Sequence, residues 1–274
     1  RAGMTTDDER RLARARKFLI ALVFFGTILN YVDRQVLSLL KPTIEAEYGW
    51  GDAEFAHFAA MSQLAAATAL IFVGWLVDRF GVRLAYGAAV VVWSMAGMAH
   101  AFAANVTQFL TARVILVAAE SINTPAAVKA AAQYLPIRQR SMAIGIVNTA
   151  PNLGNILAPL TVIPLAAMFG WKSAFIITGA LGFVWILFWI GGTRHLKPLP
   201  RAADADAREK LSFRQAAGDR GTWAIAGAKA MTDMFWWFFT FWLPDLFHKV
   251  FNLSQQELVG PTALAFSLAA LGAL

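Results

Sequence analysis

Long apolar runs separated by short polar stretches dominate this chain. A spanning helix needs about 20 apolar residues. Seven complete runs have about this length, at residues 18–40, 55–77, 85–104, 107–128, 141–167, 173–192 and 222–247. An eighth run begins near Glu257 and continues to Leu274. The pattern predicts an all-α membrane protein with seven complete spanning helices and the start of an eighth.

The composition supports a membrane location, because 58% of the residues are hydrophobic and only 15% are charged, against about a quarter charged in soluble domains. The net charge of +7 does not indicate a nucleic-acid partner. Basic residues gather in alternate connections, and the other connections carry only Lys41, Lys172 and Lys249. This asymmetry predicts a cytoplasmic N-terminus, and we expect a multi-pass protein of the bacterial inner membrane. There is no cysteine and the four histidines are scattered, so we expect no metal site.

Hydrophobicity falls and charge rises across residues 193–221. We therefore predict a cytoplasmic N-terminus at 1–17, a six-helix bundle at 18–192, a cytoplasmic connector at 193–221 and the start of a second bundle at 222–274. Charges recur in the first, fourth and seventh apolar runs. Nested inverted repeats would place those three helices around a central site.

Four ionisable side chains lie inside apolar runs: Asp33 and Arg34 within 18–40, and Arg113 and Glu120 within 107–128. Each opposes insertion by roughly 2.5–3.5 kcal/mol if it faces lipid, so we expect all four to face the protein interior or a water-filled cavity. They could form an interhelical ion pair with a purely structural role. Two arginines also suit an anionic solute, because a guanidinium binds a carboxylate bidentately, and buried acids could carry a proton.

Other polar residues in the apolar runs have two readings. Asn148, Asn152 and Asn155 share one face of the run 141–167 and could bind solute hydroxyl groups or join helices. In the run 222–247, Lys229 and Asp233 are spaced for an intrahelical ion pair. Trp236 and Trp237 follow them and could stack on a sugar or fill the core.

The stretch Gly74-Trp75-Leu76-Val77-Asp78-Arg79-Phe80-Gly81-Val82-Arg83 resembles the G-x-L-x-D-R-x-G-x-R signature of the major facilitator superfamily. It lies at the cytoplasmic end that the predicted topology requires. The resemblance assigns a conformational latch to Gly74, Asp78, Arg79, Gly81 and Arg83. It implies alternating access and carries no information about the substrate.

Further stretches resemble one branch of that superfamily, the anion:cation symporters that include hexuronate and galactonate permeases. They are residues 30–34, 113–125, 134–136, 236–238 and 241–244. The resemblance implies that Tyr31, Arg34 and polar residues of the run 141–167 contact a sugar acid. It also implies that Asp33 and Glu120 take part in proton coupling, with Arg113 close by. Two positions depart from the branch: Ala66 replaces a common tyrosine, and Met234 replaces a proline that often follows the aspartate.

These observations favour a proton-coupled importer of a small organic carboxylate, a hexuronate or an aldonate, that works as a monomer when full length. The candidate substrate contacts are Tyr31, Arg34, Asn148, Asn152 and Trp237. We expect no cofactor beyond the proton gradient and no enzymatic activity, since no nucleophile–base pair or phosphate loop is present. An exporter or facilitator with an unrelated substrate, or a membrane sensor, is the alternative. Because the family has twelve helices, the resemblance implies a fragment of a longer transporter.

Overall fold

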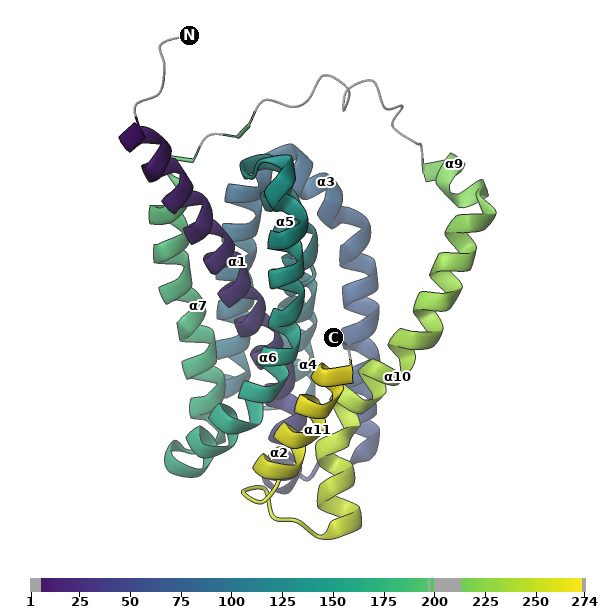
Figure 1. Cartoon of the computed structure of the whole chain (residues 1–274). Helices are drawn as coiled ribbons and strands as arrows, with labels where there is room; N and C mark the ends of the chain where they lie inside the picture. The colour runs from purple at the N-terminus through teal and green to yellow at the C-terminus, as the bar shows by residue number, and fades with distance from the viewer. Residues whose placement is uncertain (1–5, 197, 200–212, 273–274) are drawn as a thin grey trace.

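A computed structural model describes residues 6–196, 198–199 and 213–272 (Figure 1). Every regular element in these ranges is a helix, which confirms the predicted all-α fold. The helices are α1 (Thr6–Leu39), α2 (Lys41–Tyr48), α3 (Asp52–Ala99), η1 (His100–Phe102), α4 (Val106–Glu120), α5 (Asn123–Tyr134), α6 (Ile137–Phe169), α7 (Trp171–Thr193), α9 (Phe213–Gly218), α10 (Arg220–Phe251) and α11 (Val259–Gly272). Within the predicted connector at 193–221, residues 197 and 200–212 lie outside the described residues.

Helix α3 contains two of the predicted apolar runs. Gly81 interrupts it with φ of 77° and ψ of 152°, a conformation that glycine adopts at little cost because it has no Cβ. The chain reverses there, because both ends of α3 return to α2. Lys41 Nζ lies 2.8 Å from Asp52 Oδ1 at the start of α3, and Tyr48 donates a hydrogen bond of 2.7 Å to the Ala103 carbonyl just beyond its end.

Four described helical stretches are long and apolar enough to span a membrane: Asp52–Phe102, Val106–Tyr134, Ile137–Phe169 and Trp171–Thr193. The first holds both passes of α3, and the second joins α4 to α5 across a short break after Glu120. Helices α1 and α10 have 34 and 32 residues and carry the charged residues of the first and seventh runs. Helix α11 is apolar but shorter.

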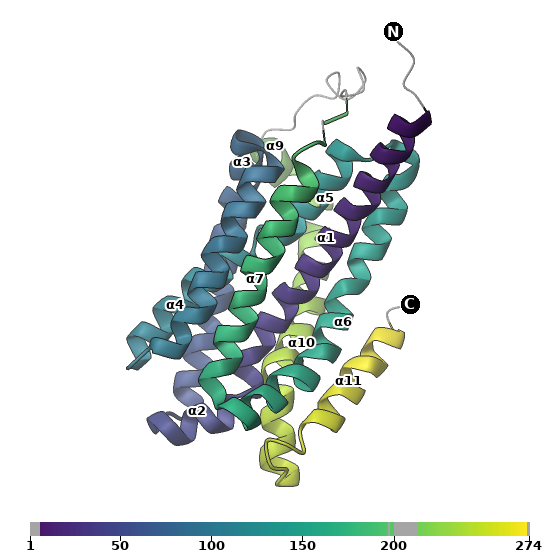
Figure 2. The same ribbon diagram turned by 90° about the vertical axis from the view of Figure 1, so that its left-hand side faces the viewer.

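Several helices pack closely on α1, α3 and α6. Helix α1 packs on α6 and α7, α3 packs on α4 and α7, and α11 lies against α6 (Figure 2). Gly154 allows the close contact between α6 and α1, because a Cβ added there would lie 2.6 Å from Tyr31 Cβ. Any side chain at this position would push the two helices apart, so the glycine fixes how near α6 comes to the charged part of α1.

The two halves of α10 differ. Its C-terminal half packs on the first helices, through Phe55–Trp242 ring contact at 5.1 Å and a 2.6 Å hydrogen bond from Ser38 Oγ to the Phe241 carbonyl. Residues 221–232 are exposed throughout and stand away from the other helices in Figure 1. Lys229 and Asp233 form a 2.8 Å ion pair in this N-terminal half. Helix α10 therefore packs against the first helices at the α2 end and stands apart from them at the Gly81 end.

Candidate functional site

The four charges predicted from the apolar runs meet between α1 and α4; we call Asp33, Arg34, Arg113 and Glu120 the central cluster. Arg34 Nε donates to Glu120 Oε2 at 3.1 Å. Arg113 donates to the Arg34 carbonyl at 3.3 Å and to Ser62 Oγ at 3.2 Å. The side chain of Arg34 is 15% exposed, whereas that of Glu120 is 0% exposed. Arg34 is therefore the charge of this cluster that a solute can reach.

Two aromatic rings flank the guanidinium of Arg34. Its Cζ lies 5.4 Å from the ring centroid of Tyr31 and 5.2 Å from that of Trp237, within the range of cation–π attraction. Tyr31 lies one turn earlier on α1, whereas Trp237 comes from α10. Three of the predicted substrate contacts thus form one group, and this group joins α10 to the first bundle.

The central cluster is incompletely bonded. Glu120 Oε1, Arg113 Nη1 and the nearby Asn30 Nδ2 are buried without a hydrogen-bond partner among the described residues. Each such atom costs about 1–3 kcal/mol when it is left unpaired. Asp33 is also buried and pairs with the side chain of Thr178 on α7. The cluster therefore retains free donors and a free acceptor for a water, a proton or a solute.

The predicted asparagines of α6 are spread in depth. Asn155 is fully buried and accepts a 3.2 Å hydrogen bond from Gln35 Nε2, a residue that the sequence analysis missed. Gln35 Oε1 and Asn155 Nδ2 have no partner in the described structure. Asn152 is half-buried, and Asn148 is exposed. Gln35 directly follows Arg34 in an apolar run, and a polar side chain at this position could have been recognised as a candidate site residue.

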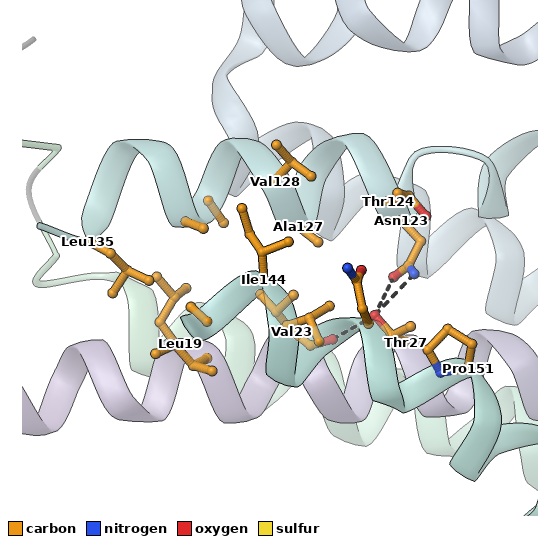
Figure 3. A pocket seen from close by; sticks show the side chains of 16 residues that line it. Leu19, Val23, Thr27, Asn123, Thr124, Ala127, Val128, Leu135, Ile144 and Pro151 are labelled. Carbon is orange, nitrogen blue, oxygen red and sulfur yellow. Dashed lines mark hydrogen bonds between the residues drawn. The ribbon is translucent and has the colours of Figure 1, made fainter. Parts of the chain in front are cut away.

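Asn148 lines a separate small pocket between α1, α5 and α6, of about 50 Å³ (Figure 3). Its polar end contains Thr27 and Asn123, and Asn123 Oδ1 also accepts a 2.5 Å hydrogen bond from Tyr86. Its other end is apolar, at Leu19 and Leu135. Because one water needs about 10–15 Å³ of such space, the pocket can hold a few waters and is too small for a sugar acid.

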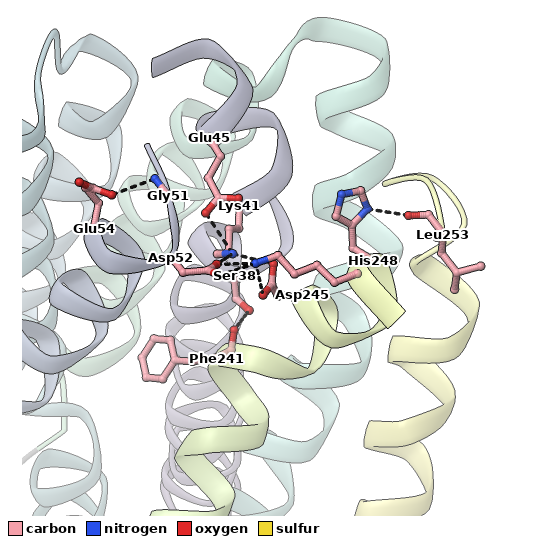
Figure 4. A network of polar contacts seen from close by, with 11 residues as sticks. Ser38, Lys41, Glu45, Gly51, Asp52, Glu54, Phe241, Asp245, His248 and Leu253 are labelled. Carbon is pink, nitrogen blue, oxygen red and sulfur yellow. Dashed lines mark hydrogen bonds and ion pairs between the residues drawn. The ribbon is translucent and has the colours of Figure 1, made fainter. Parts of the chain in front are cut away.

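A second group of charges closes the α2 end of the molecule (Figure 4); Lys41, Glu45, Asp52, Asp245 and Lys249 form the end cluster. Lys41 Nζ lies 2.6 Å from Asp245, 2.8 Å from Asp52 and 3.0 Å from Glu45. Lys249 contacts the same two aspartates, at 2.5 Å and 3.4 Å. These pairs tie α2 and the start of α3 to α10.

Burial alone would lower the pKa of Lys41, but its hydrogen bonds to Asp245, Asp52 and Glu45 outweigh burial and raise that pKa above its ordinary value. Lys41 is thus held in its charged form. None of the predicted site residues belongs to this cluster. Its signal was the rarity of cations on this side, since Lys41 and Lys249 are two of the three there.

The predicted latch lies at the opposite end, around Gly81. Asp78 forms an ion pair with Lys129 of α5, a partner that the motif did not reveal. The carbonyl of Arg83 accepts a 2.9 Å hydrogen bond from Trp189 Nε1. Gly74 and Arg79 are exposed. The motif therefore connects the turn of α3 to α5 and α7.

Comparison with known proteins gives a consistent family match. A sequence model described as Major Facilitator Superfamily matches residues 23–274. The hexuronate transporter of Escherichia coli strain K12 is 27% identical over 91% of this chain and 61% of its own length. The probable L-galactonate transporter of the same strain is 28% identical over 96% and 61%. The chain therefore spans about 61% of the length of these relatives.

Solved structures show the same fold. A bacterial homologue of the human lysosomal transporter Spinster, in an inward-facing and unoccupied conformation, has a TM-score of 0.80 and 21% identity. The match covers 94% of this chain and 61% of that chain. At this identity the likeness concerns the fold alone, and it agrees with the helix arrangement described above.

Proposed function

Since the chain belongs to the Major Facilitator Superfamily, we propose that the whole protein is a secondary transporter that imports a small organic anion together with protons. The membership confirms the resemblance drawn from the sequence motifs and the expectation that the chain is not an enzyme, because the matched relatives are transporters. Direction, coupling ion and substrate belong to the proposal, and the central cluster supports them.

The ion pair between Arg34 and Glu120 is the observation that carries the proposal. Arg34 is partly exposed and lies between two aromatic rings, so its planar guanidinium is pre-oriented for a bidentate carboxylate. The carboxylate already bound to it is Glu120 at 3.1 Å. A substrate carboxylate and ionised Glu120 therefore compete for the same cation.

This competition provides a route to proton coupling. When Glu120 takes up a proton, its attraction for Arg34 falls and the guanidinium becomes available to the substrate carboxylate. When the proton leaves, Glu120 recovers Arg34 and the substrate is displaced. Arg113 and Asp33 keep the net charge of the cluster near neutral, and Asp33 is the second candidate for the coupling acid.

The substrate class follows from the groups around Arg34. Gln35 and Asn155 retain a free acceptor and a free donor, which suit a hydroxyl group, since a hydroxyl both donates and accepts. Trp237 offers a flat apolar surface to a sugar ring. A polyhydroxylated carboxylate uses all three features, and relatives named as hexuronate and L-galactonate transporters support this class. We place hexuronates and aldonates first.

Transport requires the site to open to one side at a time. The end cluster holds α10 against α2 and the start of α3, which closes the α2 end. At the Gly81 end the N-terminal half of α10 stands away from the other helices, so this end is open. Basic residues gather at the Gly81 end, and the positive-inside rule assigns that end to the cytoplasm. The described state then corresponds to an inward-open transporter in the bacterial inner membrane.

Uptake into vesicles that contain the whole protein tests the proposal. We expect radiolabelled galacturonate or galactonate to accumulate when the outside is more acidic, and to equilibrate without accumulation when a protonophore is added. Vesicles with an Arg34→Ala variant serve as the matched control. Absence of stimulation by the proton gradient for every sugar acid tested would contradict proton-coupled import, and uptake stimulated only by an opposite gradient would indicate an exporter.

A further inference from the structure

A groove on the outer surface, away from the central cluster, has the features of a lipid site. It lies between the N-terminal halves of α1 and α6, which run side by side in Figure 2, and has a volume of about 520 Å³. Apolar side chains form most of it, and among its described lining residues none is acidic. Its apolar lining includes Ile20, Ala21, Phe24, Phe25, Met142 and Ile146.

The polar residues of the groove are confined to one end. Arg16, Lys17 and Gln139 lie at the end nearest the N-terminus. Arg16 is held there because its Nε donates a 3.1 Å hydrogen bond to the Tyr134 carbonyl. The deeper part is apolar and open: Phe25 is 57% exposed and Met142 is 72% exposed. The groove thus combines a cationic mouth with an apolar trough.

The depth of the groove fits one membrane leaflet. Its α1 side runs from Ala13 to Phe25, twelve residues or about 18 Å along a helix, which matches half of the roughly 30 Å hydrocarbon core plus part of one headgroup layer. If the 20 residues before Leu40 cross that core, Lys17 lies about 4 Å outside it, at the level of lipid headgroups. Arg10 and Arg14 continue the same face of α1 beyond Lys17.

We propose that this groove binds one anionic phospholipid, with its phosphate against Arg16, Lys17 and Gln139 and one acyl chain along the trough past Phe24 and Phe25. Charge complementarity identifies the ligand: basic pockets between spanning helices on the cytoplasmic side attract anionic headgroups, which that leaflet contains. The site rests on the proposed orientation of the protein, in which Lys17 faces the cytoplasm. It is separate from the sugar-acid site, because none of its lining residues belongs to the central cluster or is a candidate substrate contact.

Lipid retention by the purified whole protein in detergent tests this site, with native mass spectrometry as the readout. Phosphatidylglycerol is the anionic probe. Phosphatidylcholine, which is zwitterionic and has no net charge, is the control with acyl chains of the same length. With two cations at the headgroup, we expect about 30-fold tighter binding of phosphatidylglycerol. A variant with Arg16→Gln and Lys17→Gln should lose most of this preference, whereas Arg194→Gln with Arg220→Gln, which removes two charges outside the groove, should keep it.

A second variant tests the trough separately from the charges. Ala21→Phe should fill the groove and weaken retention of both lipids, without changing any charge. Equal binding of the two lipids by the wild type, or an unchanged preference in the Arg16/Lys17 variant, would overturn the proposal. No sugar acid is present in these measurements, so their failure would leave the proposed transport function untouched, and failed transport would not affect them.

Discussion

The central cluster and the end cluster are both groups of opposite charges that join helices, yet they are bonded in different ways. In the end cluster one cation, Lys41, is surrounded by three carboxylates at 2.6–3.0 Å. In the central cluster Glu120 has a single cation contact at 3.1 Å, and both Glu120 and Arg113 keep an atom without a partner.

This difference separates two uses of charge. In the end cluster Asp52 and Asp245 each contact both lysines, so this cluster serves to hold α2, α3 and α10 together. An unsaturated buried group is stabilised by whatever completes its bonds, so the central cluster suits a solute and a proton. The following changes are designed to disturb one cluster while leaving the other intact.

Arg34→Ala should have the largest effect, because it removes the only partly exposed cation of the central cluster and leaves Glu120 buried without its partner. Truncating one member of a buried charge pair costs about 2–5 kcal/mol, so substrate affinity should fall at least about 30-fold. Titration calorimetry with galactonate measures it.

Arg34→Lys is the matched control, since it keeps the charge but loses the planar fork. We expect an affinity between those of the wild type and Arg34→Ala. Near-normal affinity in Arg34→Ala would transfer the anion-binding role to Arg113.

Glu120→Gln imitates the protonated acid and should separate exchange from accumulation. The variant cannot release a proton, so accumulation driven by a proton gradient should disappear. Counterflow exchange needs no net proton movement and should stay near the wild-type rate. Both are read from the same vesicles with labelled galactonate. Persistent accumulation would move the coupling site to Asp33, which Asp33→Asn then tests.

Asp245→Asn should loosen the end cluster without touching the central one. Removing one partner of a buried pair is destabilising, so the population with an open α2 end should rise about tenfold. The chain has no cysteine, so spin labels on cysteines introduced at exposed His57 and Val250 report the distance. Lys172→Gln, which breaks the exposed pair with Glu47 at the same end, should change nothing measurable.

The same labels test the pH response of the end cluster. Hydrogen bonds to its carboxylate partners raise the pKa of Lys41 above its ordinary value. Its stabilising contribution is therefore complete below that value and is lost only as the pH rises through the folded-state pKa. The distance distribution should be the same at pH 7 and pH 9. An opening between these values would show that Lys41 is not the cation that holds the end closed.

The double change Lys229→Gln with Asp233→Asn should have the smallest effect. This i,i+4 pair is exposed on both sides, at 71% and 37%, and such pairs contribute about 0.2–0.5 kcal/mol. We expect unaltered uptake and a barely shifted unfolding transition. A clear loss of uptake would instead assign this pair to transport.

The sequence revealed the spanning runs and the central cluster because both depend on local contrast. A charge within an apolar run, such as Arg34 or Glu120, is costly when it faces lipid. Its burial beside an opposite charge can therefore be predicted from the sequence. The motif also singled out Gly81 as part of the latch, and the structure gives this glycine the positive φ of the α3 turn.

The end cluster could not be read in the same way. Lys41 and Asp245 are 204 residues apart and meet only because α10 folds against α1 and α2. Depth was also hidden: Asn148 and Asn155 share a helix face, but they lie about 10 Å apart along the axis, so one lines the small pocket and the other contacts Gln35. Local periodicity shows neither which residues far apart in the sequence come into contact nor what surrounds a residue at a given position along the helix axis.

Helix α10 contributes a residue to each of two places: Trp237 lies beside Arg34 of the central cluster, and Asp245 belongs to the end cluster. As one continuous helix it can act as a lever between them. Asp245 follows Pro244, and a proline inside a helix removes a backbone hydrogen bond and favours bending there. Measured from Asp245, Trp237 lies about 12 Å along the axis and Arg220 about 37 Å. A tilt about this fulcrum that moves Trp237 by 1 Å, as an order-of-magnitude estimate, moves the far end about threefold more. A small adjustment of the ring beside Arg34 is thereby amplified into a wide swing at the opposite face.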